Sequence, residues 1–188
     1  MSRKNLKGII VILVSAAAGF GLFFGMNIFL VNRTVTKPLE NSVRQVAGIT
    51  SVRAVDSSGK LKLDVTLGQV LDFHETYSLL SRRINEIVGK RDYELNILDN
   101  RNQQLEEAYY VMHFNIEEAI ATGGFSRMAS ALETKSKDFG LSGSRVFVDQ
   151  QGVYLQIESG ASYLYAVFPR VPAGTLSERL VFGGKAGP

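Results

Sequence analysis

The chain has 188 residues, of which 45% are hydrophobic and 21% are charged, and it contains neither cysteine nor tryptophan. This length accommodates one ordinary domain with or without a membrane segment, and the absence of cysteine excludes disulfides and thiolate metal sites. The net charge of +3 equals the contribution of Arg3, Lys4 and Lys7, so the remaining chain carries 18 basic and 18 acidic residues. A neutral domain lacks the basic surface that nucleic acids require, and we expect no nucleic-acid partner.

An apolar stretch follows this basic tip. Residues 8–31 carry no charge, and only Ser15 and Asn27 are distinctly polar. A helix of this length is about 36 Å long, which is enough to cross a hydrocarbon core of about 30 Å. Positive charge ahead of the stretch favours a cytoplasmic N-terminus. We therefore predict a single-pass protein of the cell membrane, with a cytoplasmic tip at residues 1–7, a transmembrane helix at 8–31 and a C-terminal domain outside the cytoplasm.

A cleaved signal peptide is the alternative interpretation of this stretch. Signal peptides also begin with positive charge, but their apolar core is usually about 7–15 residues long and is followed by a small-residue cleavage site. No convincing site of this kind follows residue 31. The sequence therefore favours an uncleaved anchor.

Small residues recur every four positions in the predicted membrane helix, at Ala17, Gly21 and Gly25. Helices associate in lipid through close backbone approach, which a strip of small residues permits. We predict that these three residues pack against another helix in a homo-oligomer or an envelope protein complex. The alternative is that glycine is simply common in membrane helices.

Residues 38–99, after a linker at 32–37, show the order helix, strand, strand, helix, strand. Pro38 suits the first turn of a helix, and Gly48 is a plausible stop. Alternation on both sides of a turn at residues 56–59 predicts a β-hairpin. The apolar positions that carry these patterns are Leu39, Val43, Val46 and Ala47 in the helix, and Val52, Ala54, Leu61, Leu63, Val65 and Leu67 in the hairpin.

The second helix and third strand of this segment have equally clear periods. Apolar residues between Val70 and Val88 are spaced by three and four, which predicts a helix packed on the sheet. Residues 92–98 alternate and predict a strand. The helical stripe consists of Val70, Phe73, Tyr77, Leu80, Ile84 and Val88.

Residues 100–168 are predicted to add two helices and a three-stranded antiparallel meander, which makes the fold α+β. The helices are separated by Gly123 and Gly124, and turns near 150–152 and 159–162 separate the strands. The tail at 169–188 is rich in glycine and proline, and we predict that it is flexible. The helical stripes consist of Leu105, Tyr109, Met112, Ile116 and Ala119, and of Phe125, Met128, Leu132 and Phe139.

The hairpin "GITSVRAVDSSGKLKLDVTLG" and the helix end "INEIVG" before "YELNIL" carry a resemblance to known families. Their αββαβ order beside a membrane helix resembles the ring-building motif of stage III sporulation channel proteins and type III secretion ring proteins. It is also similar to the BON and alkaline-shock families of small α/β modules. The resemblance implies lateral packing of copies, or docking to an envelope machine.

Only two histidines are available for acid–base or metal chemistry. His113 and Glu117 lie one helical turn apart beside Glu118, but a metal site needs a third ligand, so we expect a solvated helix face. His74 follows Asp72 at a helix start, where Asp72 serves as the N-terminal cap or as a first-turn residue. We predict no catalytic, cofactor-binding or metal-binding residues.

Aromatic residues gather near the end of the meander, at Tyr154, Tyr163 and Tyr165, beside Arg170. Aromatic side chains and arginine are enriched where proteins bind proteins, so these four residues are a candidate partner surface. The alternative is that the tyrosines form half of the core.

Taken together, these patterns predict a non-enzymatic membrane protein that acts in assembly or partner docking in the cell envelope. A sensor of the PAS-like kind, which signals through a membrane partner, is the first alternative because a helix-flanked sheet can hold a small ligand. An envelope hydrolase is the second.

Overall fold

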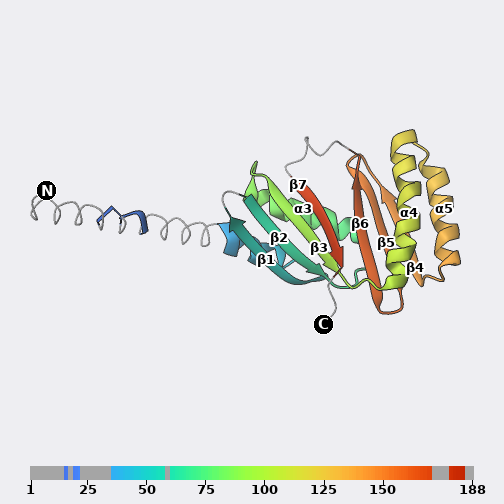
Figure 1. The fold of residues 1–188 in the computed structure, drawn as a ribbon, viewed down its shortest axis with the longest axis horizontal. Helices are drawn as coiled ribbons and strands as arrows, with labels where there is room; N and C mark the ends of the chain where they lie inside the picture. Colours follow the sequence, from blue (N-terminus) through green and yellow to red (C-terminus); the bar gives the residue numbers. More distant parts are fainter. Residues whose placement is uncertain (1–14, 17–18, 22–34, 58–59, 171–177, 185–188) are drawn as a thin grey trace, which may run out of the picture.

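The protein has an α+β fold in which two β-sheets lie beside each other and helices cover them (Figure 1). The described helical residues of the predicted membrane span are 15–16 and 19–21, and the rest of the span lies outside the described residues. No helix in the part of the chain that the structure describes combines the length and apolar character needed to span a bilayer. The computed structural model describes residues 15–16, 19–21, 35–57, 60–170 and 178–184.

The first sheet confirms the predicted helix, strand, strand, helix, strand order. Its strands β1 and β2 form an antiparallel hairpin, and β3 pairs in parallel with β2 through the crossover helix α3. Inward-facing residues of β2 and β3 alternate with less buried ones, as the period of two predicts. The elements are α2 (Lys37–Val43), β1 (Ile49–Ser57), β2 (Lys60–Leu67), α3 (Phe73–Val88) and β3 (Tyr93–Asp99).

Helix α2 ends earlier than its apolar pattern predicts. Residues 44–48 form turns, and Gly48 adopts a φ of 89°, a left-handed conformation that glycine adopts without steric cost. A Cβ atom at this position would lie 2.2 Å from Cγ1 of Val70. The close approach of Val70 therefore leaves no room for a larger residue at the α2–β1 turn.

The prediction of a flexible tail at 169–188 is wrong for residues 178–184. These residues form β7 (Glu178–Gly184), which pairs in parallel with β3 and completes the strand order β1-β2-β3-β7. The parts of the tail at 171–177 and 185–188 lie outside the described residues. The glycine and proline content of the tail suggested irregular structure rather than a strand. The pairing partner of β7 lies about 85 residues earlier in the chain, so no local sequence pattern indicates the pairing.

The second sheet is the predicted antiparallel meander, with the order β4-β5-β6. Helices α4 and α5 pack against one of its faces and lie at the far end of the molecule from α2 (Figure 1). Gly123 ends α4 in a left-handed conformation, and Gly124 precedes α5, as the paired glycines predict. The elements are α4 (Gln103–Thr122), α5 (Phe125–Asp138), β4 (Gly143–Val148), β5 (Gly152–Ser159) and β6 (Ser162–Pro169).

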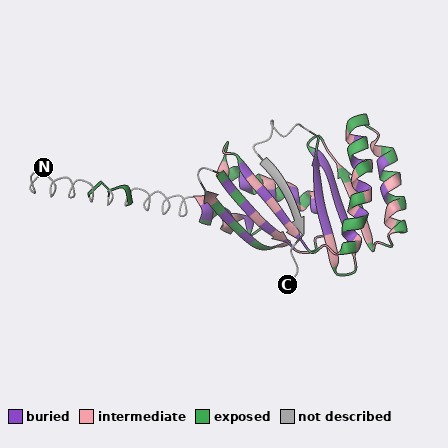
Figure 2. Cartoon of the chain, in the orientation of Figure 1, coloured by how far each residue is buried: buried purple, intermediate pink, exposed green. Residues whose placement is uncertain are grey.

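Strands β5 and β6 are buried on both faces (Figure 2). One face packs under α4 and α5 and includes Val153, Leu155 and Ile157. The opposite face contributes Tyr154 and Tyr165 to the core that α2, α3 and the first sheet build. The second sheet thus separates two apolar layers and belongs to both.

A buried carboxylate joins the two sheets. Asp99, at the end of β3, is 1% exposed and accepts two 2.8 Å hydrogen bonds from the guanidinium of Arg101. The same carboxylate accepts a hydrogen bond of 3.0 Å from the backbone amide of Tyr165 on β6. An isolated backbone bridge between Asn100 and Tyr163 lies beside it.

Candidate functional site

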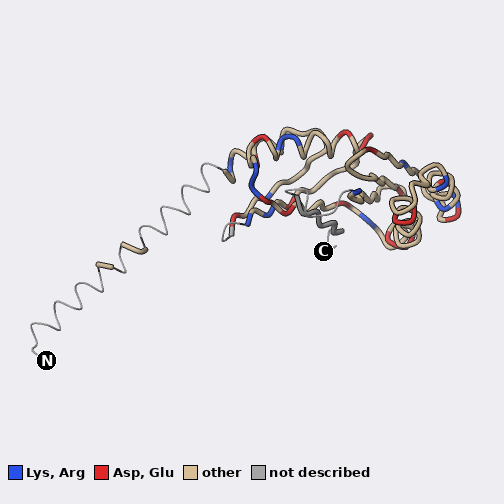
Figure 3. Tube along the Cα trace, turned by 90° about the horizontal axis from the view of Figure 1, so that it is seen from above, with Lys and Arg blue, Asp and Glu red and all other residues tan. Residues whose placement is uncertain are grey.

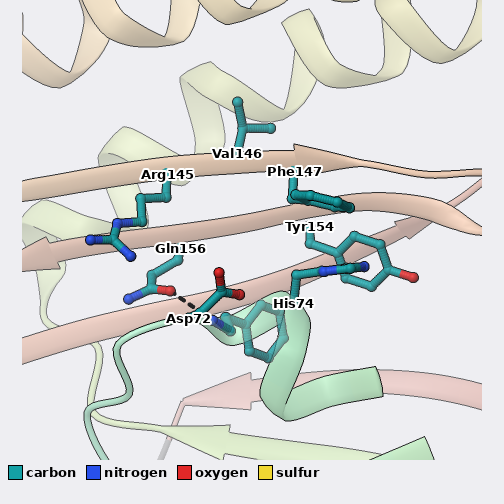
Figure 4. Close-up of a pocket in the computed structure, with 8 residues that line it drawn as sticks. Asp72, His74, Arg145, Val146, Phe147, Tyr154 and Gln156 are labelled. Carbon is teal, nitrogen blue, oxygen red and sulfur yellow. Dashed lines mark hydrogen bonds between the residues drawn. The ribbon is translucent and has the colours of Figure 1, made fainter. Parts of the chain in front are cut away.

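A cleft lies where the entry to α3 meets the edge of the second sheet. Two adjoining hollows of about 240 and 440 Å³ form it, and they share Arg145 and Gln156. Figure 4 shows the smaller hollow, with Arg145 and Phe147 on β4 above the start of α3. We call this site the β4 cleft; its walls and floor are residues 69–74, residues 142–147 of β4 and its entry, and Tyr154, Gln156 and Glu158 of β5.

Gln156 holds the cleft in shape from its floor. It is 5% exposed; its Oε1 accepts a 2.9 Å hydrogen bond from the Phe73 amide, and its Nε2 donates a 2.8 Å hydrogen bond to the Val70 carbonyl. The hydroxyl of Tyr165 accepts from the Val70 amide and donates to the Gly68 carbonyl, each at 3.0 Å. Two side chains of the second sheet therefore satisfy the backbone of the segment that leads into α3.

His74 lines the smaller hollow and pairs with Asp149 beside it. Their Nε2 and Oδ2 atoms lie 3.1 Å apart, and the imidazole stacks on Phe147 with ring centroids 3.7 Å apart. Asp72 is the N-terminal cap of α3 and accepts a 2.9 Å hydrogen bond from the Glu75 amide, as the sequence predicts. The partnership of His74 with Asp149, 75 residues away, was not foreseen from the sequence.

A histidine–aspartate pair can move a proton, but hydrolysis also needs an activated nucleophile or water. In the part of the chain that the structure describes, no serine or threonine hydroxyl hydrogen-bonds to His74. The imidazole instead lies between Asp149 and the rings of Phe147 and Tyr154. The contact between His74 and Asp149 joins the start of α3 to the β4–β5 turn.

Asp149, which pairs with His74 beside the cleft, has a lowered pKa. Burial by itself raises its pKa, but hydrogen bonds from the Gly152 amide, from His74 and from the Gln151 amide outweigh that effect and hold the pKa below its ordinary value. A carboxylate whose pKa is lowered in the folded state stabilises that state above the unfolded pKa of about 3.9. This contribution is lost as the pH falls through the folded pKa.

We expect Asp149→Asn to weaken the acid dependence of stability. The wild-type melting temperature should fall more steeply than that of the variant between about pH 5 and pH 2, because only the wild type must protonate this carboxylate. Thermal unfolding of the intact protein across this pH range measures the difference. Asp138→Asn, in an exposed pair with Lys135 on α5, is the control and should follow the wild type. Parallel curves for Asp149→Asn and the wild type would contradict the expectation.

The rim of the cleft is apolar and exposed. Leu71 is 88% exposed and Phe147 is 46% exposed. Strand β4, which carries Phe147, pairs with β5 alone among the described strands, so it is an edge of its sheet. Arg145 donates a hydrogen bond to the Leu71 carbonyl across the cleft. Edge strands beside exposed apolar side chains are ready templates for pairing with another chain.

The predicted partner surface of tyrosines is wrong. Tyr154 is 3% exposed and Tyr165 is fully buried, so the alternative that they belong to the core is correct. The Tyr163 hydroxyl donates a 3.1 Å hydrogen bond to the Leu67 carbonyl. Arg170 is exposed, but its guanidinium lies 4.7 Å from the centre of the Phe125 ring rather than beside the tyrosines. Alternation alone could not indicate that a second core covers the other face of the strands.

The outer face of α4 carries the other histidine. The Nδ1 of His113 lies 2.6 Å from the Tyr110 carbonyl oxygen, and its ring lies against Phe114. Tyr110 and Phe114 are 64% and 55% exposed, so the face is aromatic as well as acidic. No group of three potential metal-binding side chains is present within the described ranges.

The predicted helix-packing strip is described only at Gly21. Ala17 and Gly25 lie outside the described residues. Gly21 is helical, and a Cβ atom added to it would meet no atom within 4 Å. The packing role of the strip stays a prediction.

Comparison with known proteins adds no family to this description. No protein-family model, curated protein or solved structure matches the chain. The resemblance of residues 38–99 to ring-building and BON-like modules therefore stays a prediction.

Proposed function

We propose that this is a single-pass membrane protein whose α+β domain lies outside the cytoplasm and docks a partner protein of the cell envelope without catalysing a reaction. The observation that carries the proposal is the β4 cleft, in which an edge strand bears the exposed Phe147 and lies beside the exposed Leu71. Leu71 and Phe147 are large apolar groups on the surface, where their exposure is unfavourable unless another molecule covers them.

The support for the proposed membrane anchor comes from the sequence. Residues 8–31 are uncharged and long enough to cross a bilayer, and Arg3, Lys4 and Lys7 favour the cytoplasmic side. The strip of Ala17, Gly21 and Gly25 adds a surface on which a second membrane helix, from another copy or an envelope partner, can pack.

An extended segment of the partner fits the cleft best. A segment that adds a strand to β4 gains main-chain hydrogen bonds, while its alternate side chains enter the neighbouring hollows. Phe147 and Leu71 then pack against apolar side chains of the segment. Gln156 and Tyr165 keep the opposite wall in place, so the cleft is largely preformed and little ordering opposes binding.

Ligand sensing is the second candidate function. The polar lining of the larger hollow, which includes Gln69, Ser144 and Glu158, favours it. A small molecule that binds in the cleft and thereby raises the melting temperature of the intact protein would support sensing over protein docking.

The docking proposal is tested by photo-crosslinking in native membranes. We expect a photo-reactive phenylalanine analogue at Phe147 to crosslink one protein, through one extended segment that mass spectrometry can identify. Leu71→Asp should reduce this crosslink at least about ten-fold, because a buried unpaired charge opposes docking. Tyr110 on α4 is the matched control site, since its aromatic ring is also exposed.

Two outcomes would contradict the proposal. A crosslinking pattern at Phe147 that Leu71→Asp leaves unchanged would remove the cleft from the docking surface. Release of the protein from membranes by alkaline carbonate would remove the anchor, independently of the crosslinking result.

A further inference from the structure

Three exposed lysines gather at the end of the first sheet where α2 begins. We propose that this basic end, defined by Lys37, Lys60 and Lys90, binds anionic lipid headgroups and holds the domain against the membrane that anchors it. The inference rests on the proposed anchor and adds the orientation of the domain and the chemistry of the surface that it contacts.

Strand register places the three lysines at one end. Lys60 begins β2 at the hairpin turn, and Leu61 pairs with Tyr93 at the start of β3, directly after the turn that carries Lys90. Lys37 lies one helical turn before Glu40, whose Oε1 accepts a 2.8 Å hydrogen bond from the Ala54 amide near the end of β1. Figure 1 shows the start of α2 beside this end of the sheet.

The acidic groups at this end are largely engaged elsewhere. Asp56 forms an ion pair with Arg91, and Glu40 is bound to the β1 backbone. Lys37, Lys60 and Lys90 take part in no ion pair with another described residue, and Asp92 is the acidic residue left beside them. The basic end therefore presents an excess of exposed positive charge.

The opposite end of the domain, formed by α4 and α5, carries more acidic than basic residues. Helix α4 has four glutamates and neither lysine nor arginine, whereas α5 beside it has two acidic and three basic residues, and Figure 3 shows both signs of charge at this end. Arg127 of α5 lies 3.6 Å from Glu118 of α4. A negatively charged surface would therefore attract the α2 end in preference to the end formed by α4 and α5. The acidic residues of α4 are Glu106, Glu107, Glu117 and Glu118.

The short link between the predicted membrane helix and Lys37 favours lipid as the partner of the basic end. The predicted membrane helix ends at residue 31, and the six residues from there to Lys37 span at most about 22 Å even when fully extended. Lys37 therefore stays close to the headgroup layer, where each lysine near an anionic surface favours the bound state about five-fold. Three lysines together favour the docked orientation about a hundred-fold.

The absence of cysteine makes a direct test possible, because single cysteines can be labelled in the full chain. The intact protein is reconstituted in vesicles of phosphatidylcholine alone or with about 30% phosphatidylglycerol, each with a headgroup-attached spin-label quencher. A fluorophore at Asn85→Cys, exposed in the last turns of α3, reports contact with the bilayer. A fluorophore at Ala129→Cys, exposed on α5, is the control.

We expect strong quenching at residue 85 in the anionic vesicles, weak quenching in phosphatidylcholine alone, and little at residue 129 in either. About 0.5 M NaCl should reduce the anionic signal, because salt screens surface charge. The triple variant Lys37→Glu, Lys60→Glu and Lys90→Glu should abolish it. The matched triple variant on α5, Arg127→Glu, Lys135→Glu and Lys137→Glu, should leave it intact.

Equal quenching at residue 85 in both lipid compositions would overturn the inference, as would an anionic signal that survives the first triple variant. Carbonate extraction of the same vesicles separates this failure from failure of the anchor. A protein that stays in the vesicles without the lipid-dependent signal retains the anchor but not the basic end. A protein that carbonate releases loses both.

Discussion

Asp99→Ala is expected to lower the free energy of unfolding by about 3–5 kcal/mol, the cost of leaving a buried charge without its partner. The substitution removes both hydrogen bonds to the Arg101 guanidinium, whose side chain is 11% exposed, and orphans the Tyr165 amide. Because these contacts join β3 to β6, the loss falls on the junction between the sheets. Thermal and urea unfolding of the intact protein, followed by circular dichroism, measure it.

Two further variants separate this mechanism from a general loss of packing. Adding Arg101→Leu to Asp99→Ala removes the unpaired charge and should recover part of the stability. Lys62→Ala breaks the exposed pair with Glu94 and should change stability by less than about 1 kcal/mol. A loss below about 1 kcal/mol for Asp99→Ala alone would show that water or a rearranged side chain replaces the carboxylate.

Gln156→Leu is the second substitution with a large expected effect, a destabilisation of about 2–4 kcal/mol. Leucine has a similar volume but leaves the Phe73 amide and the Val70 carbonyl without their partners, and each orphaned buried group costs about 1–3 kcal/mol. The segment leading into α3 should then separate more often from the second sheet. Hydrogen exchange of the Phe73 amide should accelerate along with the fall in melting temperature.

Gln69→Leu is the matched control for this result. Gln69 also lines the β4 cleft, but its hydrogen bond to Glu158 is exposed, so its loss should cost less than about 1 kcal/mol. Unchanged exchange at Phe73 in Gln156→Leu would contradict the role of Gln156 as the group that holds the cleft wall. Crosslinking from Phe147 in the same variant would then report whether docking depends on that wall.

Local periodicity in the sequence predicted most of the helices and strands. The stripe from Val70 to Val88 predicted α3, and the alternation around the turn at 56–59 predicted the β1–β2 hairpin. These patterns are enough to predict a helix or a strand because core-facing residues repeat with the period of that helix or strand. The repeat does not depend on which other segment packs against them. The cap at Asp72 and the break at Gly123 were predictable for the same reason, since both act on neighbouring backbone.

The residues that shape the β4 cleft depend on contacts between distant parts of the chain. Gln156 binds the backbone of residues more than 80 positions earlier, and His74 meets Asp149 across 75 positions. No periodic pattern of apolar residues within a short stretch of sequence indicates such a pairing. The exposed Leu71 stands next to Val70 in the sequence, between Gln69 and Asp72, and only the folded α3 entry shows that it lies outside the core.

By itself, the sequence determined the α+β composition, the order of elements from α2 to β6 and the uncharged stretch at residues 8–31. The tertiary structure alone decided that Tyr154 and Tyr165 are core, that β7 extends the first sheet and that an edge strand borders a cleft. The physical reason is the range of the interactions. Periodicity, caps and turns act within a few residues, whereas burial on a second face and strand pairing require segments that meet only after folding.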